Sequence, residues 1–374
     1  MLTETQSLIR DTARAFAAQH LAPHAAARDK SGEYPRAAVA ELGRLGFMGM
    51  CVPEAWGGAG ADMLSYVLAL EEVAAGEGAT STIMSVNNSP VCAAIQGFGT
   101  EEQKRRWLEP LAKGEKLGAF LLTEPQAGSD ASALRTRARP EGNRYVVSGT
   151  KQFITSGSTA DLAMIFAVTE PAAGKRGISA FVVPTDAPGY RVARKEDKLG
   201  QRASDTCQIV LDELEATPDQ MLGEPGQGYR IALANLESGR VGIGAQAVGM
   251  ARAAYEAAVA YAREREAFGR KIVDHQAVQF RLADMKTRIA AARALVHEAA
   301  RLRDAGRPCL TEASMAKLFA SEMAEAVCSA ALQTFGGYGY LADFPVERIY
   351  RDVRVCQIYE GTSDVQRLVI GRDL

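Results

Sequence analysis

The sequence predicts an α+β protein of three domains: an N-terminal all-α domain, a middle antiparallel β-barrel domain and a C-terminal four-helix-bundle domain. At 374 residues, the chain is too long for one compact core. Its hydrophobic pattern is first helical, then changes to β-branched runs with alternation, and then returns to a helical period. We therefore expect the domains to span residues 1–115, 116–222 and 223–374.

The N-terminal domain is predicted to consist of short helices rich in Ala, Leu, Glu and Arg. Prolines and the glycine-rich loop 56–60 interrupt the helical pattern, because both residue types break helices. Segments 35–45 and 65–75 are predicted to be short amphipathic helices within it.

The middle domain begins after Lys116, where apolar runs rich in β-branched residues are separated by Gly, Pro, Asp and Asn. Runs of this length with turns between them are typical of an antiparallel sheet or barrel, which we expect to end near Leu222. The runs are residues 145–147, 153–155, 162–168, 178–183 and 207–211.

The C-terminal domain shows its period most clearly between Val278 and Val296. Apolar residues recur there at alternating spacings of four and three, which places one apolar seam along a long helix. A second long helix, residues 312–334, is rich in Ala and small enough on one face for close packing. Together with helices around 229–264 and 345–370, these segments predict a four-helix bundle.

The composition is that of an ordinary globular protein, with 47% hydrophobic and 24% charged residues. Because 43 basic residues nearly balance 45 acidic ones, we expect neither nucleic acid nor an anionic membrane as a partner. No apolar stretch of about 18 residues could span a bilayer. The first residues do not resemble a secretion signal. We expect a cytoplasmic bacterial protein, or a mitochondrial matrix protein if the chain is a processed eukaryotic form.

The cysteines, the histidines and the missing catalytic motifs exclude several classes of reaction. The six cysteines show no C-x-x-C pair, so we expect reduced, mostly packed thiols and no metal site. The four histidines form no H-E-x-x-H pair, and the sequence contains neither a G-x-S-x-G elbow nor a P-loop. General-base chemistry with an organic cofactor remains.

A candidate base lies near the C-terminus. Glu360 stands between Tyr359 and Gly361, and the Thr-Ser-Asp cluster at 362–364 can cap the helix that follows. Glu360 is therefore expected on a turn, where a carboxylate is either a base or an exposed loop acid.

Two segments of the middle domain offer hydrogen-bonding groups to a ligand. Residues 121–130 follow a short strand and turn sharply, and their Thr and Ser hydroxyls suit a polar ring edge. Phe153 and Thr155 stand two apart on a strand, so both can face the same side. An aromatic ring beside a threonine suits a stacked heteroaromatic cofactor, and core packing explains the phenylalanine equally well.

Two glycine-rich segments have alternative interpretations. Residues 242–247 match the dinucleotide pattern G-x-G-x-x-A, but no apolar strand precedes them, which disfavours a Rossmann fold. Residues 333–340 end the second long helix, where the glycines either cap the helix or leave the backbone open to a ligand.

In this order and at these separations, the segments resemble the acyl-CoA dehydrogenase family over essentially the whole chain. The family's motifs match the Leu-Thr-Glu-Pro-x-Ala-Gly-Ser-Asp turn at 122–130, the Lys-x-Phe-Ile-Thr strand at 151–155, residues 263–269 with His275 and Gln276, Gln-x-Phe-Gly-Gly at 333–337, and Tyr-Glu-Gly-Thr at 359–362. Residues 84–89 and 195–200 resemble the short-chain, butyryl-CoA type branch in particular.

The resemblance implies FAD held between the middle domain and the bundle, in a homotetramer where a neighbouring subunit completes the site. The residues that it implies at the flavin are Phe120, Leu122, Thr123, Gly128, Ser129, Phe153, Ile154 and Thr155, the last near N5. Those implied at the adenosine diphosphate portion, across the subunit boundary, are Arg265, Phe268, Gln276, Gln333, Phe335, Gly336 and Gly337. Those implied to close over the cofactor are Thr362, Ser363 and Asp364. Those implied at the thioester substrate are Ser129, Glu237, Arg240, Tyr359 and Gly361.

The resemblance also implies the reaction, which is the α,β-dehydrogenation of a short-chain acyl-CoA in fatty acid β-oxidation. Glu360 would abstract the α-proton while the β-hydrogen leaves as hydride to flavin N5, giving a trans-2-enoyl-CoA. The thioester carbonyl would accept hydrogen bonds from the backbone N–H of Glu360 and from a ribityl hydroxyl of FAD. Electrons would then pass to electron-transfer flavoprotein.

Some residues depart from the family pattern. Phe153 stands where many relatives have Trp, Gln126 replaces a commoner Gly, and Glu237 replaces a commoner Asp. One subset of the family has its base at the position of Gly239, which cannot act as a base, so the assignment to Glu360 is favoured.

Other functions fit the same motifs. The enzymatic alternative is a branched-chain (isobutyryl or 2-methylbutyryl) or pathway-specific acyl-thioester dehydrogenase. A non-catalytic flavin-binding relative is disfavoured by the presence of Glu360. An acyl-CoA oxidase would usually have a longer chain with an added domain.

Overall fold

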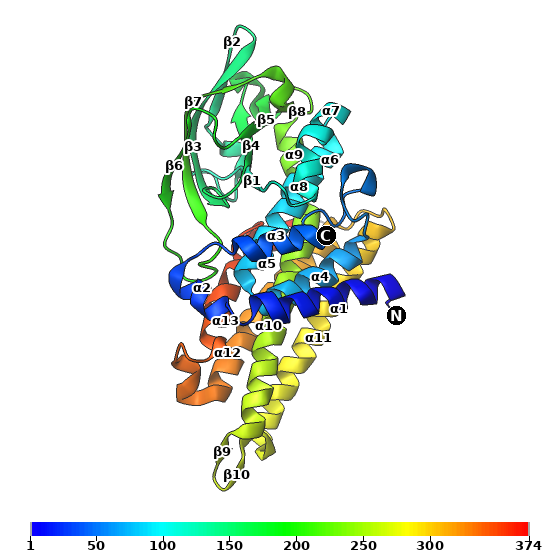
Figure 1. Cartoon of the computed structure of the whole chain (residues 1–374), viewed down its shortest axis with the longest axis vertical. Coiled ribbons are helices and arrows are strands. Elements are labelled where there is room, and N and C mark those ends of the chain that lie inside the picture. The colour runs from blue at the N-terminus through cyan, green and yellow to red at the C-terminus, as the bar shows by residue number, and fades with distance from the viewer. Residues whose placement is uncertain (1, 373–374) are drawn as a thin grey trace.

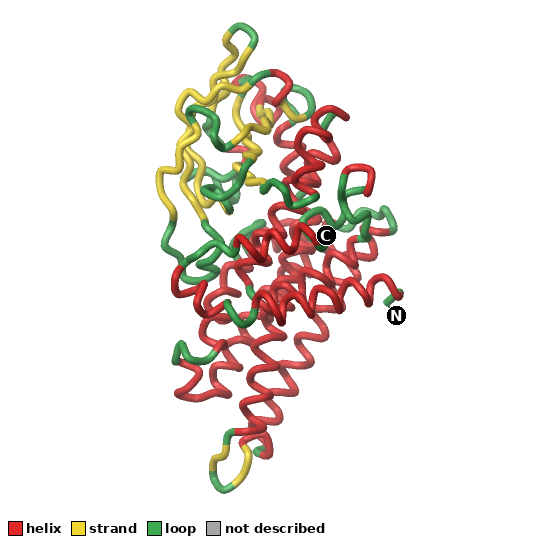
Figure 2. Tube along the Cα trace, viewed as in Figure 1, coloured by secondary structure: helices red, strands yellow, loops and turns green. Residues whose placement is uncertain are grey.

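The computed structural model describes residues 2–372. Figure 1 shows an elongated molecule with a β-sheet at one end and a long helical bundle that reaches the other end. Along the chain the elements are helical, then β, then helical, and Figure 2 shows how sharply these regions separate in space. The predicted α+β class is therefore confirmed.

The N-terminal region is a set of short helices. The first begins at a capping box in which Thr3 and Gln6 bond each other's backbone N–H groups. A π-helical segment, Asn87–Cys92, links two of the helices and contains Pro90. The helices are α1 (Glu4–Phe16), α2 (Ala25–Ser31), α3 (Arg36–Arg44), α4 (Met63–Gly76), α5 (Gly78–Val86), α6 (Ala93–Phe98), α7 (Glu101–Gln103) and α8 (Glu109–Ala112).

Helix α4 differs from the expected amphipathic helix at 65–75. Every residue of α4 except Ala75 is buried, because α1, α10 and α11 pack around it. Because the helix is covered on all sides, it has no solvent-facing polar side, and its acids Glu71 and Glu72 are buried in ion pairs instead. That expectation was wrong.

The middle region is one eight-stranded sheet. Its pairing order is β6-β7-β3-β2-β4-β5-β8, and β1 pairs with β4. Most pairs are antiparallel, while β1–β4 and β2–β4 are parallel. The strands are β1 (Gly118–Leu121), β2 (Arg137–Glu141), β3 (Arg144–Thr155), β4 (Leu162–Val168), β5 (Ile178–Pro184), β6 (Tyr190–Lys195), β7 (Thr206–Ala216) and β8 (Met221–Leu222).

Strand β3 combines two of the predicted β runs. The runs at 145–147 and 153–155 belong to this one long strand, which pairs with β7. The pairing shifts register between Lys151 and Ile154, as a β-bulge does. The shift falls directly beside Phe153, whose side chain points out of the core.

The C-terminal region is the predicted bundle of long helices. In α11 the seam residues Leu282, Met285, Ile289 and Val296 are all buried, as the sequence predicts. Burying side chains of this size contributes roughly 1.5–3 kcal/mol each. The elements are α9 (Gly228–Ala234), α10 (Leu236–Glu264), β9 (Glu266–Ala267), β10 (Arg270–Lys271), α11 (Gln276–Asp304), α12 (Leu310–Phe335), α13 (Pro345–Val353) and α14 (Ser363–Gly371).

Small residues allow α10 to pack closely against its neighbours. A Cβ at Gly249 would lie 2.2 Å from the carbonyl oxygen of Glu71, so α4 could not approach α10 if this residue were larger. The dinucleotide-like residues 242–247 lie in the middle of α10, and no strand precedes them. The helical setting excludes a Rossmann fingerprint there.

Two features are absent from residues 2–372. No helix in this part of the chain is both long and apolar enough to cross a membrane. No group of three His, Cys, Asp or Glu side chains is placed to hold a metal ion there.

Candidate active site

Glu360 lies on the turn between the 3-10 segment Arg354–Gln357 and α14. Its φ of 54° is in the left-handed region, and Gly361 follows with a φ of 88°. Thr362 then caps α14 by accepting a hydrogen bond from the N–H of Val365. The predicted turn and cap are therefore both present.

The carboxylate of Glu360 is free of direct partners. It forms neither a hydrogen bond nor an ion pair with a described residue, and its backbone N–H is likewise unbonded within that part of the chain. Helix α10 passes so close that a Cβ at Gly239 would lie 2.7 Å from Oε2 of Glu360. The glycine thus makes room for the carboxylate.

Burial raises the pKa of Glu360, and this effect outweighs the opposing positive charges of Lys317 and Arg240. Arg240 is only 4% exposed and bonds Ser314, while its Nε has no partner among the described atoms. A carboxylate with a raised pKa and no hydrogen bonds has a higher affinity for a proton, as a general base requires.

A cavity of about 130 Å³ joins Glu360 to the sheet. Its wall includes Phe120 of β1 and Thr123 just after that strand, and the end of β3 contributes Phe153 and Thr155. Phe153 is 65% exposed and has a positive φ, so its ring stands at the rim. The structure thus brings the predicted base and four predicted flavin contacts to one place.

The adjoining 123–130 turn is held by a buried ion pair. Lys151 donates to Glu124 at 2.8 Å and also to the carbonyl of Phe166 at 2.7 Å. Glu124 in turn accepts from the N–H groups of Arg135 and Thr136. These bonds fix the base of the turn and leave its tip exposed.

A second cavity of about 260 Å³ shares Thr82, Thr155 and Tyr359 with the first. The buried Oγ of Ser204 in its wall has no hydrogen-bond partner among the described atoms. An exposed aromatic ring, several hydroxyls and one unsatisfied hydroxyl suit a planar ring with polar edges. The residues present therefore fit the flavin part of FAD.

Six other predicted cofactor residues lie elsewhere, around a cavity of about 650 Å³ near the β9–β10 hairpin. Figure 1 places this hairpin at the end of the molecule opposite the sheet. Phe268 on the hairpin is 97% exposed. No residue lines both this cavity and the Glu360 cavity. The predicted residues in its wall are Arg265, Phe268, Gln333, Phe335, Gly336 and Gly337.

Other predicted residues line neither the Glu360 cavity nor the hairpin cavity. Gln276 is the exposed first residue of α11, and the side chain of Ile154 is buried in the core. Glu237 accepts hydrogen bonds from the N–H and thiol of Cys309. The residues in neither the Glu360 cavity nor the hairpin cavity are Leu122, Ile154, Gly128, Ser129, Glu237, Arg240, Gln276, Gly361, Thr362, Ser363 and Asp364.

Several lining residues were not predicted. Gln246 on α10 bonds Ser81 and Thr82 and accepts from the hydroxyl of Tyr359 at 3.3 Å, which makes one wall of the Glu360 cavity polar. Its only sequence signal was the misleading G-x-G-x-x-A match. The others are Thr82, Ser85, Val86, Pro90 and Ile243.

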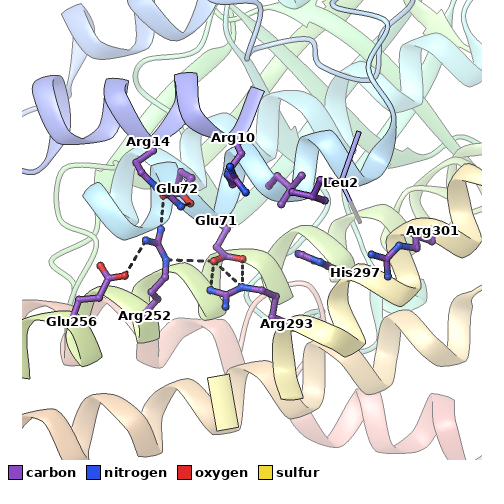
Figure 3. A pocket seen from close by; sticks show the side chains of 11 residues that line it. Leu2, Arg10, Arg14, Glu71, Glu72, Arg252, Glu256, Arg293, His297 and Arg301 are labelled. Atoms are coloured by element: carbon purple, nitrogen blue, oxygen red, sulfur yellow. Dashed lines mark hydrogen bonds and ion pairs between the residues drawn. The ribbon is translucent and has the colours of Figure 1, made fainter. Parts of the chain in front are cut away.

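A larger cavity, about 720 Å³, lies between α1, α4, α10 and α11 and is drawn in Figure 3. Here Glu71 accepts from Arg293 at 3.0 Å, and Glu72 accepts from Arg14 at 2.8 Å and from Arg252 at 2.6 Å. We call these five residues the Arg–Glu cluster. Each of its carboxylates is paired, so the cluster offers no free base.

Comparison with known families covers most of the chain. Residues 3–115, 119–214 and 226–374 match the N-terminal, middle and C-terminal domain models of acyl-CoA dehydrogenase. The chain is 48% identical to an acyl-CoA dehydrogenase of Bacillus subtilis, over 100% of this chain and 98% of that one. It is also 48% identical to the mitochondrial short-chain specific acyl-CoA dehydrogenase of Bos taurus, over 100% of this chain and 90% of the relative.

Solved structures agree with this result. Butyryl-CoA dehydrogenase from Megasphaera elsdenii superimposes with a TM-score of 0.98 at 42% identity, covering 100% of this chain and 98% of that chain. A chain from work on the electron transferring flavoprotein of Acidaminococcus fermentans gives 0.98 at 46% identity, with the same coverage. A glutaryl-CoA dehydrogenase of Mycobacterium smegmatis in complex with FADH2 gives 0.95 at 34%, covering 100% and 95%. The chain therefore belongs to the acyl-CoA dehydrogenase family of oxidoreductases.

Proposed function

We propose that this protein is an FAD-dependent short-chain acyl-CoA dehydrogenase in which Glu360 abstracts the α-proton of the acyl thioester. The observation that carries the proposal is the unpaired carboxylate of Glu360, which lines a cavity together with Phe153 and Thr155. The relatives named for short-chain acyl-CoA substrates, and the relative solved with FADH2, support the substrate class and the cofactor.

The residues of the cavity suit a difficult proton transfer. A thioester α-hydrogen is a very weak acid, so its base must lie within hydrogen-bond reach in a site that excludes water. Glu360 offers an unbonded carboxylate for the proton and an unbonded backbone N–H for the thioester carbonyl. A donor of this kind is typically worth roughly 10²–10³ in rate. FAD, when bound, supplies the acceptor for the hydride that leaves the β-carbon.

The small cavity and its polar wall favour a short acyl chain. Gln246 is fully buried, and its amide is held by Ser81 and Thr82. A long apolar chain pushed against this amide would leave polar groups without partners, which costs free energy. A branched-chain acyl-CoA of similar volume is the second candidate substrate.

The separation of the two cofactor cavities supports a homotetramer that shares its FAD sites. The flavin residues and the hairpin cavity do not meet within one chain, so a neighbouring subunit would bring its hairpin to the sheet. Exposed apolar side chains on α11, α12 and α14 offer the surface for such contacts, since exposed apolar patches mark association sites. They include Phe280, Phe319 and Leu368. Light scattering of the purified holoprotein checks the mass, and a monomer with full FAD content would contradict the shared site.

We also propose that the domains divide at residues 1–115, 116–222 and 223–374.

We propose further that electron-transfer flavoprotein receives the electrons. The structural relative from work on an electron transferring flavoprotein supports this acceptor. Reduction of electron-transfer flavoprotein during turnover, without stoichiometric hydrogen peroxide in air, is the expected result. Peroxide release at the rate of turnover would instead indicate an oxidase.

Anaerobic bleaching of the bound flavin tests the proposed substrate. The panel is butyryl-, isobutyryl-, hexanoyl- and glutaryl-CoA, each mixed with the yellow holoprotein. We expect butyryl-CoA to bleach the flavin fastest. Fastest bleaching by isobutyryl-CoA would select the branched-chain alternative, and a flavin that no member of the panel bleaches would contradict the proposal.

A further inference from the structure

Lys317 on α12 is a buried ammonium next to the turn that carries Glu360. Its side chain is 0% exposed, and Nζ donates one hydrogen bond, to the carbonyl oxygen of Gly361 at 2.5 Å. The described residues give it no carboxylate partner. Burying a charged group without an ion pair is costly, so a role beyond packing is expected.

The hydrogen bond of Lys317 holds a strained turn. Glu360 has a positive φ, which a residue with a side chain rarely adopts and which persists only where its surroundings enforce it. The carbonyl of Gly361 also accepts from the amide of Gln366 at 2.9 Å, and that same amide donates to the carbonyl of Glu360 at 3.2 Å. Lys317 and Gln366 thus hold the turn from two sides.

The charge of Lys317 also acts on the carboxylate. Positive charges from α10 (Arg240) and α12 (Lys317) lower the pKa of Glu360 against the raising effect of burial. Burial lowers the pKa of Lys317 itself to about 8, while the neighbouring groups Cys356 and Glu360 raise it and Arg240 lowers it. Burial and, to a smaller extent, the charge of Glu360 raise the pKa of Tyr66 on α4.

We propose that Lys317 is a positioning residue for Glu360, which holds the Glu360–Gly361 turn through its hydrogen bond and places a positive charge beside the carboxylate. The inference rests on the proposed role of Glu360 as base. One donor and one charge, both on the same ammonium, would thus set the geometry of the base and the pH at which it works.

The test separates the charge from the hydrogen bond. Lys317→Met removes both, Lys317→Gln removes the charge but keeps a donor, and Gln366→Leu removes the second donor without changing the charge. The measurement is kcat/KM for butyryl-CoA between pH 5.5 and 9, with FAD content taken from the flavin absorbance. Since an opposite charge nearby lowers a carboxyl pKa by about one unit or more, we expect the acid limb to rise by about one pH unit in both lysine variants.

Gln366→Leu is the control variant, because it removes a hydrogen bond to the turn and leaves the charge of Lys317 in place. Gln366→Leu should slow turnover without moving the acid limb. An acid limb that stays at the wild-type pH in Lys317→Gln, or that moves equally in Gln366→Leu, would overturn the inference. If Lys317→Met does not fold, Lys317→Gln carries the test alone. An active Glu360→Gln variant would contradict the proposed function itself, whatever the lysine variants do.

Discussion

Glu71 and Glu360 are two carboxylates inside the helical part of the molecule, and their surroundings are opposite. Glu71 is 5% exposed and is held by Arg293 and Arg252, as Figure 3 shows. Glu360 has no hydrogen-bonded or ionic partner among the described residues, although Lys317 and Arg240 are near enough to lower its pKa.

This difference distinguishes a carboxylate that stabilises the fold from one that can act as a base. A carboxylate whose lone pairs are taken by arginines stabilises the fold but cannot easily accept a proton. A carboxylate that is partly withdrawn from water and left free has a raised affinity for a proton. Cavity size alone would point to the Arg–Glu cluster, at about 720 Å³, over the Glu360 cavity, at about 130 Å³. Whether a carboxylate is paired or unpaired is therefore a better indication of the active site than the size of the cavity.

The largest change is expected when a paired carboxylate is made free. Burial would raise the pKa of Glu124, but the charge and hydrogen bond of Lys151, together with the hydrogen bonds from Thr136 and Arg135, lower it to about 2. Lys151→Met leaves this carboxylate buried without its partner, so we expect a loss of about 3–5 kcal/mol in the free energy of unfolding. Urea denaturation of the holoprotein measures it. The double variant Lys151→Met, Glu124→Leu should recover part of the loss, and a loss under about 0.5 kcal/mol in the single variant would show that the pair is not structural.

Removing a carboxylate from the Arg–Glu cluster should cost less, because its arginines are partly exposed. We expect Glu71→Ala to lose about 2–3 kcal/mol of stability while the turnover of the folded holoprotein stays unchanged. Arg10→Ala, which removes an exposed pair with Asp11, is the control and should change stability by less than about 0.5 kcal/mol. A Glu71→Ala variant that folds normally but does not turn over would contradict the structural role.

Asp352 is a third buried carboxylate, and its titration should make the stability of the protein depend on pH. Burial raises its pKa to about 6, against the lowering effect of Arg348 and of the hydrogen bond from Gln201. Since the folded pKa lies above the unfolded one, its contribution to stability is fully present below about pH 4 and is lost as the pH rises through about 6. Between pH 5 and pH 8 the stability of the wild type relative to Asp352→Asn should therefore fall by roughly 1 kcal/mol. A difference that is constant with pH would contradict the raised pKa.

The smallest effect on stability is expected at Gly239, where the change should appear in the rate instead. Its Cβ would lie 2.7 Å from Oε2 of Glu360, and the flexible end of that side chain can move aside at little cost in stability. We expect Gly239→Ala to displace the carboxylate and to slow flavin bleaching by about tenfold or more. Gly242→Ala, elsewhere on α10, is the matched control, and equal rates in both variants would show that the carboxylate is not crowded there.

The sequence predicted those features that depend on local pattern. The four-three spacing predicted the buried seam of α11, and the residues around Glu360 predicted the turn and the Thr362 cap. The amphipathic pattern assigned to 65–75 failed because burial of α4 depends on three helices distant in sequence. The contacts of Lys151 with Glu124 and of Lys317 with Gly361 join residues 27 and 44 positions apart, so no local pattern could reveal them.

The most direct test of the central claim is the anaerobic stopped-flow rate of flavin bleaching by butyryl-CoA in two matched holoproteins, Glu360→Gln and Glu71→Gln. Because general-base catalysis contributes typically 10²–10⁴-fold, we predict a loss of about 10³-fold in Glu360→Gln with normal FAD content, and a rate within about twofold of the wild type in folded Glu71→Gln. A Glu360→Gln variant that bleaches at nearly the wild-type rate would contradict the account.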